Sequence, residues 1–181
     1  MTDLVLTLIG PDRPGLVEAV AEIVSAQGGN WLESRMARLA GKFAGILRVE
    51  VPKDKAEATL VALAGLERRG LKIVAESSGE PLLVDAGRIL DLELVGLDRP
   101  GIMREISQLL ASRGANVEDL SSDRTSAPMS GETLFCVKAR VRLPSTSDLS
   151  ALRRDLEQLT SDLTVEIHLV EADPETEGRN A

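Results

Sequence analysis

Aromatic residues, cysteine and histidine are nearly missing from this 181-residue chain, which has two Phe, one Trp, no Tyr, one Cys and one His. Without exposed rings the chain lacks the stacking platform on which RNA-binding sheets hold bases. A single cysteine, Cys136, excludes an internal disulfide framework. His168 is the one histidine, so a multi-histidine metal site cannot be built, and no nucleophile-and-base constellation is recognisable around it in the sequence. We therefore expect no catalytic residues, no metal and no cofactor.

Long apolar runs and an excess of positive charge are missing as well. No run of about 18 apolar residues occurs, so we expect no membrane span. The first residues lack the basic start and apolar core of a signal peptide. The formal net charge of −8 disfavours contact with phosphate backbones. These features predict a cytoplasmic protein that binds neither a membrane nor nucleic acid directly.

The most informative feature that is present is an internal duplication. The segment Gly10–Leu16 (GPDRPGL) returns as Gly96–Ile102 (GLDRPGI), 86 residues later (96 minus 10). Farther on, Phe43 matches Phe135 at an offset of 92, so the second copy carries six extra residues (92 minus 86). The chain therefore contains two copies of one unit, which we call the first and the second module.

Apolar residues after each repeated segment have the spacing i, i+4, i+7, i+8, which predicts one buried face of a helix. In the two modules these positions are Leu16, Val20, Ile23 and Val24, and Ile102, Ile106, Leu109 and Leu110.

The sequence of each module predicts the order strand, helix, strand, strand, helix, strand. In the first module the expected strands are 4–9, 31–39, 43–51 and 71–75, and the expected helices are 14–27 and 53–69. In the second, the expected strands are 89–95, 117–125, 134–143 and 163–170, and the expected helices are 101–112 and 148–159. This order predicts an α+β fold: two tandem ferredoxin-like βαββαβ domains, each an antiparallel sheet with its helices on one face. The predicted boundaries are 1–76 for the first domain, 77–88 for a linker, 89–170 for the second domain and 171–181 for a disordered acidic tail.

The repeated Asp-Arg-Pro-Gly segment lies between the end of a strand and the start of a helix. The first backbone amides of a helix are unpaired and sit at the positive end of its dipole, which suits an anion. Glycine at 15 and 101 would let a ligand approach the backbone, and Arg13 or Arg99 could pair with a carboxylate. The alternative is a structural turn, in which Asp12 caps the helix amides and the arginine is solvated.

Two other groups of polar residues recur or cluster. Asn30 and Asn116 each stand two residues after a helix-ending glycine. Their amides could bond an amino group and a carboxylate together, or simply bond their own backbone. Lys138, Arg140 and Arg142 follow one strand face, either as a solvated surface or as a docking surface for an acidic partner.

The Asp-Arg-Pro-Gly turn, the amphipathic helix after it and the Gly-x-Asn that follows resemble the ACT domain, across 4–75 and 89–170. ACT domains are regulatory modules that pair and often bind amino acids where two modules meet. A chain of two such domains with no catalytic partner most resembles the glycine cleavage system transcriptional repressor family. Those proteins are thought to respond to glycine and to restrain a DNA-binding activator by contacting it.

This resemblance implies ligand contacts from the turn and the asparagine of each module. The implied residues are Asp12, Arg13, Pro14, Gly15, Leu16 and Asn30 in the first module, and Asp98, Arg99, Pro100, Gly101, Ile102 and Asn116 in the second.

The leading hypothesis is a non-enzymatic regulator. It would form a homo-oligomer, bind a small, glycine-like amino acid at ACT interfaces and modulate a partner transcription factor. The alternatives are a ligand-independent interaction module and a regulatory subunit of an amino-acid metabolic enzyme. Pro11 becomes Leu97 and Gly29 becomes Ala115 in the second module, so we expect the two ligand sites to differ.

Overall fold

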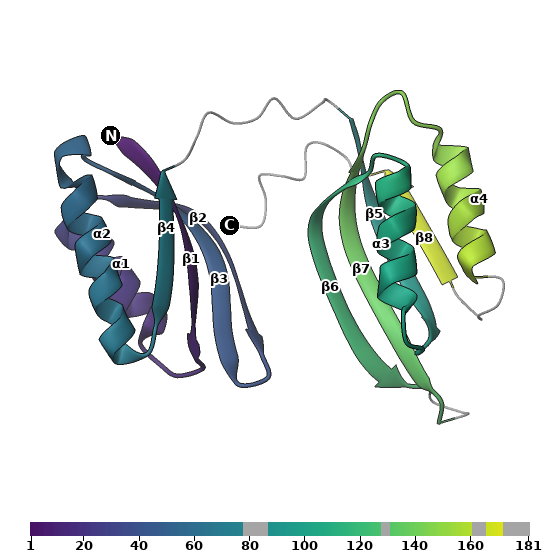
Figure 1. The fold of residues 1–181 in the computed structure, drawn as a ribbon, viewed down its shortest axis with the longest axis horizontal. Helices are drawn as coiled ribbons and strands as arrows, with labels where there is room; N and C mark the ends of the chain where they lie inside the picture. The colour runs from purple at the N-terminus through teal and green to yellow at the C-terminus, as the bar shows by residue number, and fades with distance from the viewer. Residues whose placement is uncertain (78–86, 128–130, 161–165, 172–181) are drawn as a thin grey trace. The chain divides into compact units, whose positions relative to one another are not determined.

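The computed structural model describes residues 1–77, 87–127, 131–160 and 166–171, and the chain divides into two compact units, Met1–Leu82 and Leu83–Ala181 (Figure 1). Each unit holds one module and is described by itself. The predicted linker and acidic tail lie almost wholly outside the described residues, so the four predicted boundaries stay predictions.

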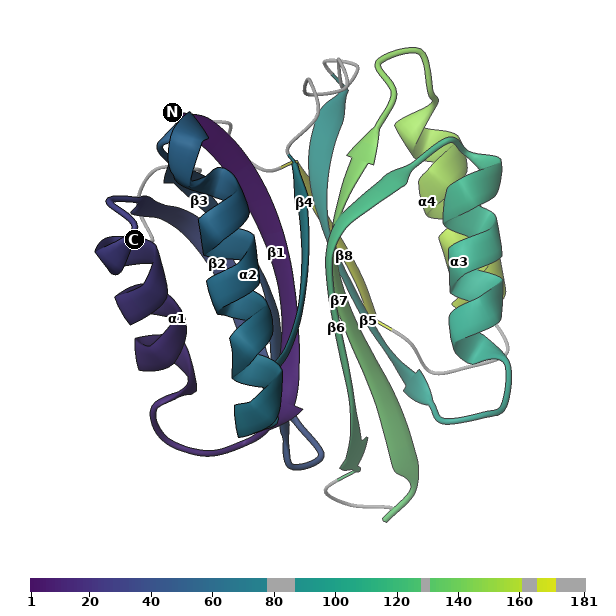
Figure 2. The same ribbon diagram turned by 60° about the vertical axis from the view of Figure 1, so that its left-hand side comes forward.

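The first unit has the element order predicted from its sequence. Its elements are β1 (Thr2–Pro11), α1 (Leu16–Ala26), β2 (Asn30–Leu39), β3 (Lys42–Val51), the short 3₁₀ turn η1 (Lys53–Lys55), α2 (Ala56–Ala64), the 3₁₀ turn η2 (Gly65–Arg69) and β4 (Lys72–Ser77). The sheet order is β2-β3-β1-β4, with antiparallel pairing throughout. Figures 1 and 2 show α1 and α2 together on one face of this sheet, which confirms the ferredoxin-like prediction.

The second unit repeats this topology. Its elements are β5 (Arg88–Leu97), α3 (Ile102–Ser112), β6 (Asn116–Ser126), β7 (Thr133–Leu143), α4 (Leu149–Thr160) and β8 (Glu166–Glu171), and its sheet order is β6-β7-β5-β8. The six extra residues lengthen β6 and β7 by one residue each relative to β2 and β3, and they lengthen the connection between the strands by four.

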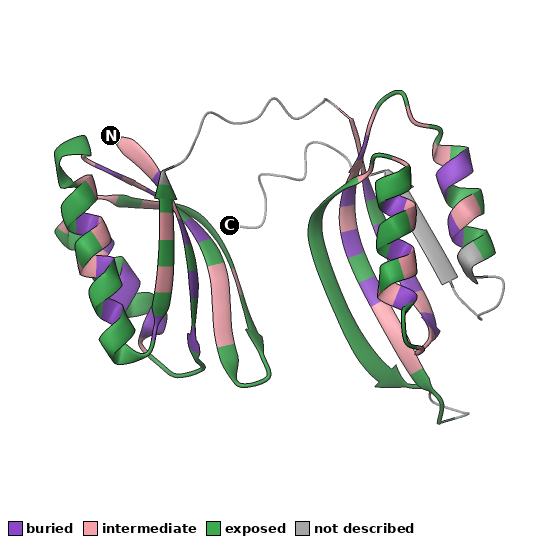
Figure 3. Cartoon of the chain, in the orientation of Figure 1, coloured by how far each residue is buried: buried purple, intermediate pink, exposed green. Residues whose placement is uncertain are grey.

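Each module buries one side of its sheet against its helices (Figure 3). Alternate residues of a strand face opposite sides, so one set of leucines and valines in β1 and β3 lines the core. In the first module this set comprises Leu4, Leu6, Leu8, Leu47, Val49 and Val51. The predicted helix face joins it: Leu16, Val20 and Val24 are buried and Ile23 packs against them. The matching positions of β5, β7 and α3 form the second core.

The starts of both first helices differ from the prediction. Pro14 and Gly15 were expected inside the first helical turn, but α1 begins at Leu16 and α3 at Ile102. Gly15 has φ 84° and Gly101 has φ 91°, both in the left-handed region. A right-handed helix cannot contain that conformation, so the glycine becomes the residue before the helix.

The second helix of the first module is also shorter than predicted. The expected helix over 53–69 is nine α-helical residues flanked by the 3₁₀ turns η1 and η2. The tighter η2 begins at Gly65, a poor helix former. Leu63 and Leu66 of this segment are buried, and Leu60 packs against the core. In the described part of the chain, no helix has the length and apolar character needed to cross a bilayer.

Candidate functional site

The turn that leaves β1 is tied to the neighbouring β2–β3 hairpin. The Asp12 N–H donates to the Gly41 carbonyl at 3.0 Å, and the Asp12 carboxylate pairs with Arg38 Nε at 2.6 Å. A charge-assisted bond of this length fixes the direction of the aspartate side chain. The turn therefore has a defined position relative to the sheet.

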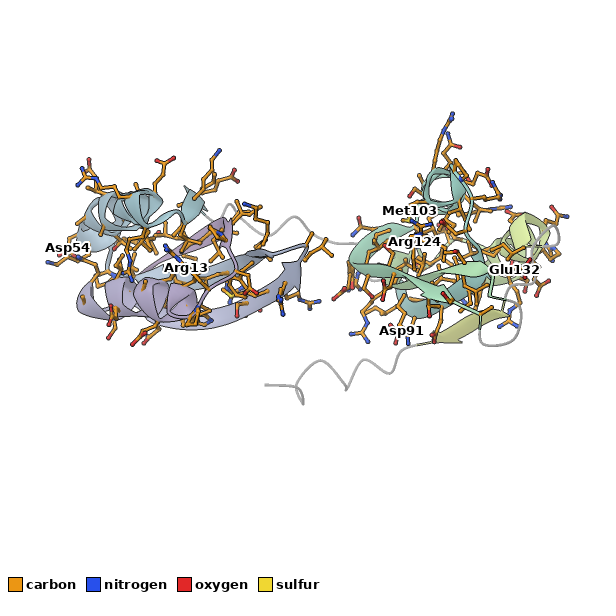
Figure 4. The ribbon with its side chains drawn as sticks, turned by 90° about the horizontal axis from the view of Figure 1, so that it is seen from below. Arg13, Asp54, Asp91, Met103, Arg124 and Glu132 are labelled. Carbon is orange, nitrogen blue, oxygen red and sulfur yellow. The ribbon has the colours of Figure 1, made fainter. Side chains whose placement is uncertain are left out.

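The second module has the same two contacts between its turn and its hairpin. The Asp98 N–H donates to the Thr133 carbonyl at 2.9 Å, and the Asp98 carboxylate pairs with Arg124 Nη2 at 2.7 Å. Arg124 lies 86 residues after Arg38 (124 minus 38), the offset of the repeat itself. Figure 4 shows the side chains of each module, with Arg13 labelled in the first and Arg124 in the second.

The structural alternative is wrong in expecting Asp12 to cap α1, whereas the exposed Arg13 agrees with the solvated arginine that it expected. The Asp12 carboxylate faces Arg38 instead, and among the described residues no side chain caps α1 at Gly15 or α3 at Gly101. The amides of the first turn of α1 therefore have no side-chain oxygen bound at the cap. Uncapped amides at the start of a helix are groups that attract an anion in general.

The turn arginines have different surroundings in the two modules. Arg99 forms a two-pronged contact with Glu105, with Nη1 2.7 Å from Oε1 and Nη2 against Oε2. These hydrogen bonds hold the pKa of Glu105 below its ordinary value. Arg13 is exposed, with Nη2 beside Gly70, and no described residue offers it a hydrogen bond or an ion pair. Ala19 occupies the position that matches Glu105 (105 minus 86).

A carboxylate also lies beside each turn glycine, but from a different helix position. Glu18 Oε2 is 3.7 Å from where a Cβ on Gly15 would be, and Glu105 Oε1 is 4.0 Å from the same point on Gly101. Both acids stand in the first turn of their helices, where the dipole favours negative charge.

The structure does not bring the turn and the asparagine of one module together. Asn30 lies opposite Glu50 in the sheet, and Glu50 lies opposite Asp3 at the start of β1. The turn follows Pro11 at the other end of β1, about 26 Å away at 3.3 Å per residue. Asn116 has the corresponding place, opposite Arg142 at the far end of the second sheet. One small ligand can therefore contact a turn and an asparagine only if they come from two different modules.

Asn30 does not bond its own backbone, which was the alternative prediction. Its Nδ2 donates to Glu50 Oε1 at 2.8 Å, across the β2–β3 pair. A ligand that binds the Asn30 amide would have to share it with this carboxylate.

The predicted basic face in β7 is already neutralised by ion pairs. Lys138 pairs with Glu93 at 2.9 Å, Arg140 pairs with Asp91 at 2.9 Å, and Arg142 pairs with Glu118. The Asp91 carboxylate raises the pKa of Arg140. An open depression lies over the Lys138–Glu93 and Arg140–Asp91 pairs, and Asp119 and Ser121 also line it. Mutual pairing leaves little free positive charge for an acidic partner.

Three residues at the turns were not predicted: Arg38, Arg124 and Glu105. The two arginines recur at the offset of 86, so that repetition was a visible signal. The contact of Glu105 with Arg99 joins residues six positions apart, and the signal for it was the change to Ala19 in the other copy. His168 lies in β8 opposite Glu93, where the structure describes the backbone but not the side chain.

Comparison with known proteins agrees with this architecture. Models of the ACT domain match residues 2–75 and 91–160. The chain is 23% identical over 166 residues to the glycine cleavage system transcriptional repressor of Escherichia coli (strain K12), covering 90% of this chain and 86% of that protein. Its fold is similar to that of an unknown protein from Galdieria sulphuraria, with a TM-score of 0.84, 27% identity and coverage of 95% and 99%.

A solved structure provisionally named a glycine cleavage system transcriptional repressor also shares the fold. Its TM-score is 0.70 at 20% identity, covering 94% of this chain and 98% of that one. The duplicated sequence, the repeated βαββαβ topology and the two model matches lead to one conclusion: the chain belongs to the ACT-domain family and carries two ACT domains in tandem.

Proposed function

We propose that this tandem ACT protein is a non-enzymatic regulator that binds a small amino acid and changes its contacts with a protein partner when the ligand is bound. The observation that carries the proposal is the uncapped start of α1, with Gly15 before it and, in the same turn, Arg13, which pairs with no residue in the described part of the chain. We infer that it acts in the cytoplasm as a homo-oligomer.

The α-carboxylate of the ligand would lie on the first amides of α1. The helix dipole and the free N–H groups favour an anion there, and Gly15 presents no Cβ to the approaching ligand. Arg13 could swing from Gly70 to add a charge-assisted bond. A glycine-like ligand is favoured because the backbone itself is the binding surface.

The other end of the ligand would meet a different module. Asn30 and Asn116 lie about 26 Å from the turn of their own module by the strand geometry above, so each can serve only a turn from a second module. Two modules that share one ligand are held in one arrangement by it. A ligand that prefers one arrangement shifts the population toward it, and a partner that distinguishes the arrangements then senses the ligand.

The relationship to the E. coli repressor favours a transcription factor as that partner. The net charge of −8 argues against direct DNA binding by the chain itself. Capture of partners from the source cell, with and without the ligand, tests this step. Recovery of an amino-acid metabolic enzyme in place of a transcription factor would overturn it.

Ligand binding is tested by a melting-temperature screen with the common amino acids, followed by calorimetry on those that raise the melting temperature. A ligand bound only by the folded state must raise stability. We expect a saturable signal from glycine or a similarly small amino acid, lost in Arg13→Gln and kept in the control Arg68→Gln, which changes an exposed arginine of η2. Folded protein that gives neither a shift nor heat with any amino acid would reject the proposal.

A further inference from the structure

We propose that the second module is closed to ligand by its own side chain: Glu105 occupies Arg99 in place of a ligand carboxylate, so that only the first module takes up the amino acid. The part about uptake rests on the proposed function. The closure itself is a property of the chain and can be measured without any ligand.

The geometry of the Arg99–Glu105 contact is that of a bound carboxylate. Both terminal nitrogens of the guanidinium face the two oxygens of Glu105, with Nη1 and Oε1 2.7 Å apart. This two-pronged pairing is also how an arginine recognises a free carboxylate. A ligand at the second turn would have to displace an acid that is already in the preferred geometry.

Glu105 is held in place for this role by the helix. Its N–H donates to the Gly101 carbonyl at 3.1 Å, which fixes its backbone in the first turn of α3. Its Oε1 lies beside Gly101, at the approach to the backbone that the missing Cβ leaves open. A tethered carboxylate competes at an effective concentration of about millimolar, so a weakly bound free ligand is excluded.

The first module lacks this closure on the same scaffold. Ala19 has no carboxylate to offer, and none of the described residues pairs with Arg13. Glu18 lies beside Gly15, but no described contact joins it to Arg13. The two turns share a left-handed glycine and an Asp–Arg pair to the hairpin. The second differs in that Glu105 holds its arginine and the Ile102 N–H donates to the Arg99 carbonyl at 3.3 Å, and both differences disfavour a ligand carboxylate there.

The closure is tested by the rate at which phenylglyoxal modifies each arginine, measured by peptide mass spectrometry on the full chain. Arg13 should react faster than Arg99. Glu105→Ala should raise the modification rate of Arg99 by about fivefold, which corresponds to the upper range of energies for an exposed ion pair, while the exposed Arg68 of the first module serves as the reference. Glu18→Ala is the matched control and should leave Arg99 unchanged. An unchanged rate at Arg99 in Glu105→Ala would overturn the inference.

Calorimetry with glycine tests uptake. We expect one bound ligand per chain in the wild type and two in Glu105→Ala. Arg13→Gln should abolish binding, and Arg99→Gln should retain it. Two ligands per wild-type chain, or loss of binding in Arg99→Gln alone, would overturn the inference. If no amino acid binds while Arg99 is protected until Glu105 is removed, the proposed function fails and the closure stands.

Discussion

At the scale of single residues, Gly15 and Gly101 decide the shape of both turns. Their φ angles of 84° and 91° cost an L-residue about 1–2 kcal/mol. We predict that Gly15→Ala lowers the free energy of unfolding by that amount in urea titrations. The cause would be backbone strain, since the nearest atom to the new Cβ is 3.7 Å away.

Gly65 is the matched control for this substitution. Its φ of −59° is ordinary helical backbone, and apart from the adjoining residues and the helix's own backbone no atom of the described chain lies within 4 Å of the new Cβ. Gly65→Ala should be neutral or stabilise by up to about 1 kcal/mol. Equal losses in both variants would contradict the assigned role of the left-handed turn.

Glu105 should make part of the free energy of unfolding depend on pH in the acidic range. Hydrogen bonds from Arg99 lower its folded pKa, so the charged form favours the fold. That contribution is complete above the unfolded pKa of about 4.3 and is lost as the pH falls through the lower folded pKa. We predict that the stability difference between wild type and Glu105→Gln is constant near neutral pH and shrinks below about pH 4.

Urea unfolding from neutral pH to pH 3 measures this difference. The stability difference between wild type and Arg99→Gln should shrink at low pH in the same way. A Glu105 pKa at or above the ordinary value in an NMR titration would contradict the contact.

At the scale of elements, the Asp–Arg pair links the turn to the hairpin. Arg38 and Asp12 are 74% and 32% exposed, so we expect Arg38→Ala to cost less than about 1 kcal/mol of stability. Its effect on ligand affinity should be larger, because a released turn must be ordered again on binding. Calorimetry and urea unfolding measure the two quantities, with Arg68→Ala as the control. Unchanged ligand affinity in Arg38→Ala would show that the Asp12–Arg38 pair does not position the ligand site.

The elements also show what the sequence could reveal. The alternation in β1 and β3 and the apolar face of α1 are periodic, so the fold and the core could be predicted. The start of α1 could not, because one left-handed glycine overrides the preference of Pro14 for a first helical turn. The turn and the asparagine that were predicted to form one site lie level with opposite ends of β1. Their separation follows from the strand register, which the composition of the segments does not reveal.

At the scale of the whole molecule, the two cores have no residue in common among those that the structure describes. Leu6 and Leu92 are matched buried positions of the repeat. We predict that Leu6→Ala lowers the free energy of unfolding by about 2–5 kcal/mol. The protection of backbone amides from hydrogen exchange should fall most in residues 2–77. Leu92→Ala should weaken protection most in the second module. Leu39→Ala, at a side chain 78% exposed, is the control and should change little. Equal loss in both modules from either variant would show that they unfold as one unit.

The measurement that tests the central claim most directly is the backbone amide NMR spectrum during titration with glycine. The account predicts saturable shifts that are largest at Leu16, Val17 and Glu18, the first amides of α1, with little change at the matching start of α3. Signals that stay fixed at millimolar glycine, or shifts centred away from both turns, would contradict it.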